Sequence, residues 1–318
     1  MTPPALDRDV PAELDGARVD RVVASLLGLP MATVKRLCRD GRVRLAGRRA
    51  AAGDRASAGQ GIVVLGLAIG APPGGRATVG VGDVRWFVPA PPLPTLYADA
   101  DVVVVDKPAG MACHPLLPGE GGTAMDAAVA AFPDVAHVGP VAREGGLLHR
   151  LDHDTSGCLA VARHADAFAQ LAPLLRGDHG ATSGPAAMKT YLALVHGGID
   201  AAFVVDEPVE SDPGDPRRAR LGGARPARTV VTPRGRGVDV SLVELALFGG
   251  RRHQLRVHLA TRGHALVADA LYGAPASPFA PTFLLHAWRL GLPGRVVVEA
   301  ALPARFRAAL VACGVRVP

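Results

Sequence analysis

The chain has 318 residues, of which 49% are hydrophobic and 20% are charged. These fractions are ordinary for a globular protein and exclude a fibrous chain or one that is disordered throughout. The length predicts roughly two domains, and the formal net charge of +6 favours a polyanionic partner. The four cysteines lie far apart without a Cys-x-x-Cys pair, which argues against a zinc ribbon and a disulfide framework.

The sequence predicts neither export nor membrane insertion. Residues 1–13 contain acidic residues and prolines, whereas a signal peptide begins with basic residues followed by an apolar segment. The chain has no run of about 18 apolar residues, the length that is needed to cross a membrane. We therefore expect a cytoplasmic protein whose cysteines are reduced.

Residues 11–65 are predicted to form a small α+β module. Apolar residues recur at helical spacing from residue 20 to 27, and a second short helix is predicted from 33 to 39, ended by Gly41. Residues 42–47 and 61–65 alternate or run apolar between glycines, as short strands do. Nine basic residues against two acidic ones give segment 16–49 an excess of +7: Arg18, Arg21, Lys35, Arg36, Arg39, Arg42, Arg44, Arg48 and Arg49.

A linker and a larger domain are predicted to follow. Residues 66–92 are rich in glycine and proline and form the linker. In the domain 93–318, strands are predicted at 102–105, 159–162, 190–195, 241–247, 283–290 and 295–299. Their irregular spacing favours a mixed, largely antiparallel sheet of the α+β class over a doubly wound parallel sheet. Segment 206–234, with its prolines, glycines and arginines, is interpreted as one long loop.

The most informative segment is His149-Arg150-Leu151-Asp152-His153-Asp154-Thr155-Ser156-Gly157. Its polar residues directly precede the apolar run 158–162, which indicates a reactive loop at the edge of a strand. The segment resembles the H-R-L-D-x-x-T-S-G signature of the RluA-type RNA pseudouridine synthases, and it matches every specified position.

Further motifs of that family occur in the expected order. They are Asp106-Lys107-Pro108-Ala109-Gly110 with His114-Pro115, Lys189-Thr190-Tyr191-Leu192-Ala193-Leu194-Val195, Gly250-Arg251-Arg252-His253-Gln254-Leu255-Arg256-Val257-His258-Leu259, and Leu285-His286-Ala287. Several ordered motifs are far more specific than one, and the resemblance spans residues 93–290. Lys107 and His114 are interpreted as shaping a turn beside the site. Residues 16–65 also resemble the alpha-L RNA-binding module that is best known from a small-subunit ribosomal protein.

The resemblance implies that the chain converts uridine in RNA to pseudouridine, a reaction that moves the ribose from a ring nitrogen to a ring carbon. No redox agent is needed, and neither a cofactor nor a metal is expected. A carboxylate can start this reaction as nucleophile or base, and the resemblance assigns that role to Asp152. A buried carboxylate stays ionised beside a cation, which by the motif match is Arg256. Whether Asp152 attacks the sugar, attacks the ring or abstracts a proton stays open.

Two more side chains receive roles from the resemblance. A stacked base must be extruded before an enzyme can reach it, at a cost of roughly a few kcal/mol. Arg150 would fill the vacated space, and Tyr191 would stack beneath the uracil and relay a proton. On the residues alone, Tyr191 alternates with Ala193 and Val195 as a core aromatic does, and Arg256 lies on a predicted helix 253–262 like a solvent-facing arginine.

RNA is the expected partner. The basic module would contact phosphates through Arg18, Lys35, Arg36, Arg39 and Arg42. Because aromatic residues make up only 4% of the chain, phosphate contacts and shape should outweigh base stacking. Ribosomal RNA is the expected substrate, transfer RNA is the alternative, and the enzyme is expected to act as a monomer.

Two functions of other classes stay open at this point. His149 and His153 are four residues apart beside two aspartates, a combination that zinc-dependent hydrolases use, although the segment lacks the H-E-x-x-H helix pattern. A non-catalytic RNA-binding protein would need only the basic module. That function predicts a degraded catalytic motif, whereas Asp152, Tyr191 and Arg256 are all present.

Overall fold

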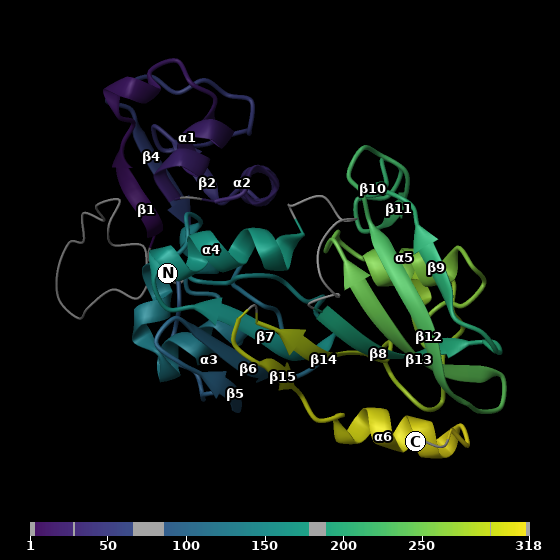
Figure 1. Ribbon diagram of the computed structural model, residues 1–318. Coiled ribbons are helices and arrows are strands. Elements are labelled where there is room, and N and C mark those ends of the chain that lie inside the picture. Colours follow the sequence, from purple (N-terminus) through teal and green to yellow (C-terminus); the bar gives the residue numbers. More distant parts are fainter. Residues whose placement is uncertain (1–3, 28, 66–85, 178–188, 293, 316–318) are drawn as a thin grey trace. The chain divides into compact units, whose positions relative to one another are not determined.

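The computed structural model describes residues 4–27, 29–65, 86–177, 189–292 and 294–315 (Figure 1). They fall into two compact units, Met1–Pro91 with His114–Gly145, and Pro92–Cys113 with Gly146–Pro318. The units group residues by contact and therefore do not follow the three predicted segments, 11–65, 66–92 and 93–318. Most of the predicted linker lies outside the described residues. Its boundaries stay predictions.

Residues 4–65 of the first unit form a four-stranded antiparallel sheet with two helices. The strand order is β1 (Pro4–Asp9), β4 (Gly61–Leu65), β2 (Val43–Leu45) and β3 (Arg48–Arg49). The two predicted helices are confirmed as α1 (Val19–Leu27) and α2 (Met31–Arg39), and the two predicted strands as β2 and β4. The sequence pattern does not predict β1, because a proline and three charged residues leave little apolar alternation.

The two helices bury one face each. Helix α1 buries Val19, Val22, Val23 and Leu26, the i, i+3, i+4 and i+7 positions of one helical stripe. Helix α2 buries Val34, Leu37 and Cys38 and leaves its basic residues on the opposite, exposed face. A short 3-10 turn, η1 (Ala12–Leu14), precedes α1.

The other helices of the first unit lie between residues 124 and 144. Helix α3 (Ala124–Ala131) is followed by the 3-10 turns η2 (Pro133–His137) and η3 (Ala142–Glu144). Thr123 and Asp126 form a capping box at the start of α3, which satisfies two backbone N–H groups at once. The buried carboxylate of Asp126 also accepts a hydrogen bond from Val88 N at 2.9 Å. Asp126 therefore has a structural role in this helix.

The second unit contains a nine-stranded sheet. Its order is β5 (Thr95–Ala98), β6 (Val102–Lys107), β7 (Ser156–Ala162), β14 (Leu285–Gly291), β8 (Lys189–His196), β13 (Val240–Phe248), β12 (Arg228–Arg236) and β9 (Phe203–Asp206), with β15 (Val297–Glu299) paired to β14. All pairs are antiparallel except β7 with β14. The predicted mixed, largely antiparallel sheet is confirmed, as are the six strands predicted for it.

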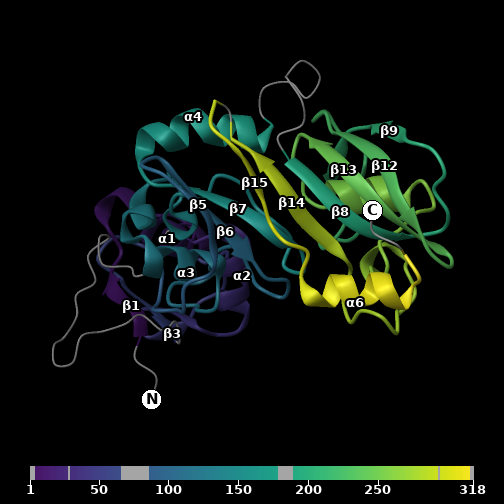
Figure 2. The same cartoon turned by 60° about the horizontal axis from the view of Figure 1, so that its bottom comes forward.

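Helices pack against this sheet and bury its hydrophobic core. Helix α4 (Ala165–Arg176) packs against β7, and α6 (Ala304–Ala312) buries Phe306 and Leu310 against Leu194, Leu242 and Leu284 (Figure 2). Helix α5 (Gln254–Ala260) lies inside the predicted helix 253–262, and the 3-10 turn η4 (Ala270–Tyr272) follows it. Among the described residues, no helix is long and apolar enough to span a membrane.

The prediction of one long loop from 206 to 234 is wrong. The segment contains the hairpin β10 (Val209–Ser211) with β11 (Ala219–Leu221), and it enters β12 at Arg228. In β12, Thr229 and Val231 are buried while their neighbours are partly exposed, which is the alternation of a half-buried strand. Pro233 lies at an irregularity of the β12–β13 register, where a missing N–H is tolerated. Prolines and arginines hid this alternation in the sequence.

Candidate active site

Asp152 lies in a loop that leads directly into β7. The backbone of this loop is bonded on both sides of Asp152. Leu151 N donates to Cys113 Sγ, and the same thiol donates to Leu151 O, each at 3.2 Å. On the other side, His153 O accepts from Gly110 N at 3.0 Å, and Asp154 O accepts from an Nη of Arg305 at 3.0 Å. The loop therefore holds Asp152 in one position.

The buried side chain of Lys107 is hydrogen-bonded to the same loop. Its side chain is fully buried, and its ammonium donates to the carbonyl oxygens of Pro108, Met111 and His153 at 2.7 to 3.0 Å. Burial lowers the pKa of Lys107 to about 8 because the charged form loses its hydration. The interpretation of Lys107 as a residue that shapes a turn beside the site is confirmed.

Gly157 fixes the end of the loop. Its φ is +110°, a conformation that side chains rarely adopt, and a Cβ atom here would lie 2.2 Å from Ala287 O. Gly157 pairs with Ala287 in the parallel β7–β14 contact. Only glycine lets the two backbones approach this closely, which explains the last position of the His149–Gly157 motif.

The ion pair expected between Asp152 and Arg256 is present. Arg256 Nη1 donates to Asp152 Oδ2 at 3.3 Å, and the side chain of Asp152 is 24% exposed. The arginine, 7% exposed, also donates from Nε and Nη2 to the two carboxylate oxygens of Asp269, both at 2.7 Å. Burial alone would lower the pKa of Arg256, but the bonds and charges of Asp269 and Asp152 outweigh it and raise that pKa. Arg256 is therefore a permanent cation between two carboxylates.

Two aromatic rings enclose the guanidinium of Arg256. Its Cζ lies 4.3 Å from the ring centre of Phe283 and 5.0 Å from that of Tyr272, as in a cation–π contact. The Tyr272 hydroxyl accepts from Ala219 N at 2.7 Å and lies 2.9 Å from His253 Nδ1. The interpretation of Arg256 as solvent-facing is therefore wrong, because the side of α5 that carries it is buried.

Tyr191 lies on β8 and is buried, with 5% of its surface exposed. Burial raises the pKa of its phenol, and the negative charge of Asp152 raises it further. Both effects keep the hydroxyl protonated at neutral pH. The phenol is thus a buried, neutral group, and the charge of Asp152 contributes to its raised pKa.

The histidine pair that suggested a metal site has other partners. His149 is buried, its Nε2 accepts from Ala160 N at 3.1 Å, and burial lowers its pKa to about 3. His153 is exposed and its Nδ1 lies 2.9 Å from Asp154 Oδ1. Across the described ranges, no three His, Cys, Asp or Glu side chains group as a metal site. Arg150 is exposed, as a residue that contacts RNA must be.

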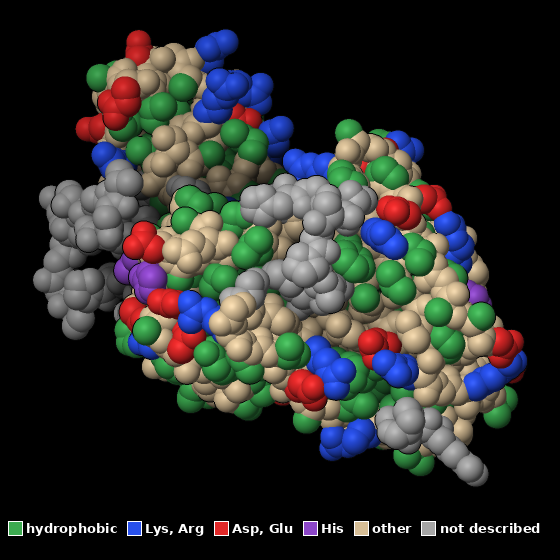
Figure 3. Space-filling model, in the orientation of Figure 1, with side chains coloured by type: hydrophobic (Ala, Val, Ile, Leu, Met, Phe, Trp, Pro, Cys, Tyr) green, Lys and Arg blue, Asp and Glu red, His purple; other side chains and the backbone are tan. Residues whose placement is uncertain are grey.

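The other predicted RNA-binding residues lie in the first unit. Lys35, Arg36 and Arg39 are exposed along α2, and Figure 3 shows basic side chains gathered on one side of this module. Arg42 is partly buried and its Nε donates to Leu65 O at 3.1 Å. Arg18 is exposed, but it forms two hydrogen bonds with the buried carboxylate of Asp20, which balances its charge.

Comparison with known proteins places the chain in a family. The sequence model of the RNA pseudouridylate synthases matches residues 101–261, which include Asp152, Tyr191 and Arg256. An uncharacterized RNA pseudouridine synthase of Synechocystis sp. is 35% identical over 241 residues, or 71% of each chain. The ribosomal large subunit pseudouridine synthase D of Neisseria meningitidis serogroup B is 30% identical over 299 residues, 88% of this chain and 73% of that one.

The chain belongs to the RNA pseudouridine synthase family. Solved structures agree with this synthase in fold. The human RNA pseudouridylate synthase domain containing 1 superposes with a TM-score of 0.53 at 26% identity, covering 70% of this chain and 87% of that one. The human domain containing 4 has the same TM-score at 24% identity, covering 70% and 94%.

Sequence reasoning missed the residues that surround Arg256. Asp269, Tyr272 and Phe283 lie between the motifs used for the resemblance, and no periodicity marks them. The pairing of Asp269 with Arg256 joins residues 13 positions apart through a turn after α5. The available signal was chemical: an aspartate in an otherwise apolar stretch, Ala268-Asp269-Ala270-Leu271, requires a buried partner.

Proposed function

We propose that this synthase isomerises specific uridines of ribosomal RNA to pseudouridine, with Asp152 as the nucleophile. The support for a ribosomal substrate is that several similar proteins, among them those of Neisseria meningitidis and Nitrosomonas europaea, are named ribosomal large subunit pseudouridine synthase D. Transfer RNA is the alternative substrate. The proposed chemistry needs no metal or redox cofactor, because every chemical role below is filled by a side chain of this chain; that the enzyme acts as a monomer stays a prediction.

The proposal rests on the position of Asp152, whose partly exposed carboxylate lies beside the permanent cation of Arg256. Arg256 donates one hydrogen bond to Asp152, to Oδ2 at 3.3 Å, and places a positive charge beside it. The side chain of Asp152 is 24% exposed, so a substrate can approach it. A carboxyl group that has a cationic neighbour, lies in a hydrogen-bonded loop and is partly exposed suits the role of a nucleophile or a base.

Tyr191 and Arg150 complete the proposed site. The phenol of Tyr191 stacks beneath the extruded uracil and, because its pKa is raised, stays neutral until it relays the proton released from the ring carbon. A neutral phenol can pass one proton on while it accepts another. Exposed Arg150, two residues before Asp152, fills the space that the uracil leaves in the RNA.

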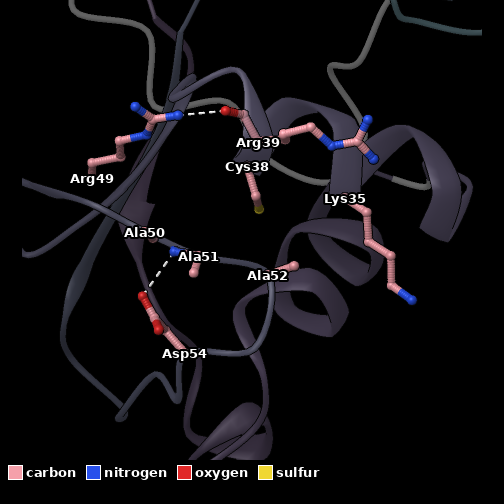
Figure 4. Close-up of a pocket in the computed structure, with 8 residues that line it drawn as sticks. All are labelled: Lys35, Cys38, Arg39, Arg49, Ala50, Ala51, Ala52 and Asp54. Carbon is pink, nitrogen blue, oxygen red and sulfur yellow. Dashed lines mark hydrogen bonds between the residues drawn. The ribbon is translucent and has the colours of Figure 1, made fainter.

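The N-terminal module is proposed to bind RNA phosphates in the manner of the alpha-L module. A cavity of about 440 Å³ opens beside α2, lined by Lys35, Arg39, Arg49 and Asp54 with three alanines and Cys38 (Figure 4). Lys35 and Arg39 extend from α2, whereas Arg49 comes from β3. Three cations around one cavity against a single carboxylate suit the sugar-phosphate backbone. Arg36 adds to this surface, Arg42 contributes partly, and Arg18 contributes least because of its ion pair.

The test is to map pseudouridines in total RNA from cells with the gene, without it, and with the Asp152→Asn gene. We expect one or more ribosomal sites to lose pseudouridine in the second and third strains. Loss confined to transfer RNA would move the proposal to the alternative substrate. An unchanged pseudouridine map without the gene would contradict the proposed function.

A further inference from the structure

We propose that Asp269 is a positioning residue for the reaction, which holds Arg256 so that a single N–H group of the arginine faces Asp152. The inference rests on the roles proposed above for Asp152 and Arg256. Asp269 is 1% exposed and lies at the start of η4. Asp269 is assigned no contact with the reacting atoms and acts only through Arg256.

The hydrogen bonds of Arg256 are divided unequally between the two carboxylates. Asp269 receives two parallel bonds of 2.7 Å, from Nε and Nη2, whereas Asp152 receives one bond of 3.3 Å from Nη1. Two parallel charge-assisted bonds are the strong arrangement for an arginine and a carboxylate, and they fix the plane of the guanidinium. The position of Arg256 is therefore set by Asp269 and not by Asp152.

The unequal sharing of the hydrogen bonds of Arg256 affects how reactive Asp152 is as a nucleophile. If Nε and Nη2 of Arg256 faced Asp152 instead of Asp269, both oxygens of Asp152 would accept hydrogen bonds and become less nucleophilic. With these two groups bonded to Asp269, Arg256 bonds only Oδ2, and the second oxygen of Asp152 has no bond from the arginine. The arrangement gives Asp152 a neighbouring positive charge while it keeps one oxygen available for attack.

The backbone on both sides of the pair supports a constrained position. Ala268, directly before Asp269, has a φ of +66°, and His253, at the start of α5 that carries Arg256, has a φ of +56°. Left-handed conformations are unfavourable for residues with a Cβ atom, and they cluster where function fixes a position. The rings of Phe283 and Tyr272 limit the guanidinium further.

The experiment compares five proteins: the wild-type chain, Asp269→Asn, Arg256→Gln, the double variant of both, and Asp126→Asn. Each is assayed for single-turnover pseudouridine formation at saturating RNA transcript, for RNA affinity by filter binding, and for melting temperature. Asp126→Asn is the matched control, because Asp126 is an equally buried carboxylate with a structural role in α3. The double variant leaves no buried charge unpaired, so it remains informative even if a single variant folds poorly.

We expect Asp269→Asn to lower the single-turnover rate constant by about 100-fold, with RNA affinity within about threefold of the wild type. In the Arg256→Gln background, the same substitution should change the rate by less than about threefold, because Asp269 acts through Arg256. Asp126→Asn should lower the melting temperature and leave the rate near that of the wild type.

Three outcomes would overturn the inference: an Asp269→Asn enzyme with the wild-type rate, an equal rate loss in both backgrounds, or a loss that Asp126→Asn reproduces. Each of these requires an active wild-type enzyme. A wild-type protein that forms no pseudouridine in ribosomal or transfer RNA would instead contradict the proposed function, so the two failures are distinguishable.

Discussion

Arginine serves two opposite purposes in this protein. In the second unit, Arg256 is 7% exposed, pairs with two carboxylates and packs against two aromatic rings. In the N-terminal module, Arg36 and Arg39 lie on the exposed face of α2. A buried arginine that is hydrogen-bonded to two carboxylates presents its charge at one fixed position. An exposed arginine attracts a polyanion at a distance and is screened by salt. Substitutions in the two regions should therefore change different measured quantities.

Apart from Asp152 itself, the largest effect is expected at Tyr191 on β8. Tyr191→Phe keeps the ring but removes the hydroxyl, so single-turnover rates should fall by about 10² to 10⁴ if the phenol relays a proton. Stability and RNA affinity should change little. Tyr191→Ala should also destabilise the protein by roughly 3 to 5 kcal/mol, as truncation of a large buried residue does. Rates and melting temperatures of both variants distinguish these roles, and an active Tyr191→Phe enzyme would refute the proton relay and leave Tyr191 a stacking or packing residue.

Arg256→Lys tests whether charge alone suffices at the buried position. A lysine keeps the positive charge but cannot form two parallel bonds with Asp269, so we expect a rate loss of about 10² to 10³ with nearly unchanged RNA affinity. The control is Arg289→Lys on β14, whose arginine is partly exposed and paired with Glu299. Equal rates for both variants would mean that the geometry of the Arg256 site is unimportant.

In the basic module, the same kind of change should affect binding and not the rate at saturation. Replacing Lys35, Arg36 and Arg39 together with glutamine should weaken RNA binding and flatten its salt dependence by about 2 in the log–log slope, at roughly 0.7 per lost contact with single-stranded RNA. The matched control replaces Arg217, Arg220 and Arg234, which are exposed but paired with acidic residues. If both triple variants showed the same slope, the module would have no special role in RNA binding.

The smallest expected effect concerns Lys107 and pH. Its pKa is lowered to about 8 by burial, against 10.5 for an unburied lysine. Between these values the unfolded chain binds one more proton than the folded chain, so the contribution of Lys107 to the free energy of unfolding rises with pH, by up to about 1 kcal/mol per unit. Urea unfolding at pH 7.5 and 9.5 should show the wild type gaining stability relative to Lys107→Met. A pH-independent difference would contradict the lowered pKa.

The sequence predicts the regular elements wherever local apolar patterns are strong. The apolar strands β6 and β7 and the helices α1 and α2 follow directly from such patterns. Weak patterns failed: β1 contains a proline and charged residues, and the short strands β10 and β11 lie among arginines and glycines. Those strands form because a partner strand supplies hydrogen bonds, which is a tertiary effect and not visible locally.

The candidate site shows the same limit. The motifs predict Asp152, Tyr191 and the partner Arg256, because these lie inside runs with a known order. The apolar residues around Asp269 indicate only that it has a buried partner; that this partner is Arg256 could not be predicted, since it depends on a contact with the far side of Arg256. Nor could Arg18 be separated from the other basic residues, because its bond with Asp20 depends on the burial of that carboxylate. Contacts that define a role through a partner require the structure.

The role of Asp152 is tested by comparing Asp152→Asn with Asp154→Asn in single-turnover pseudouridine formation. The two aspartates share one loop and have similar side-chain exposure, 24% and 26%. We expect Asp152→Asn to form no detectable pseudouridine while its RNA affinity stays within about tenfold of the wild type, because one charge among many phosphate contacts changes binding little. Asp154→Asn should remain active. Substantial activity in Asp152→Asn, or equal loss in both variants, would contradict the assignment of Asp152 as the nucleophile.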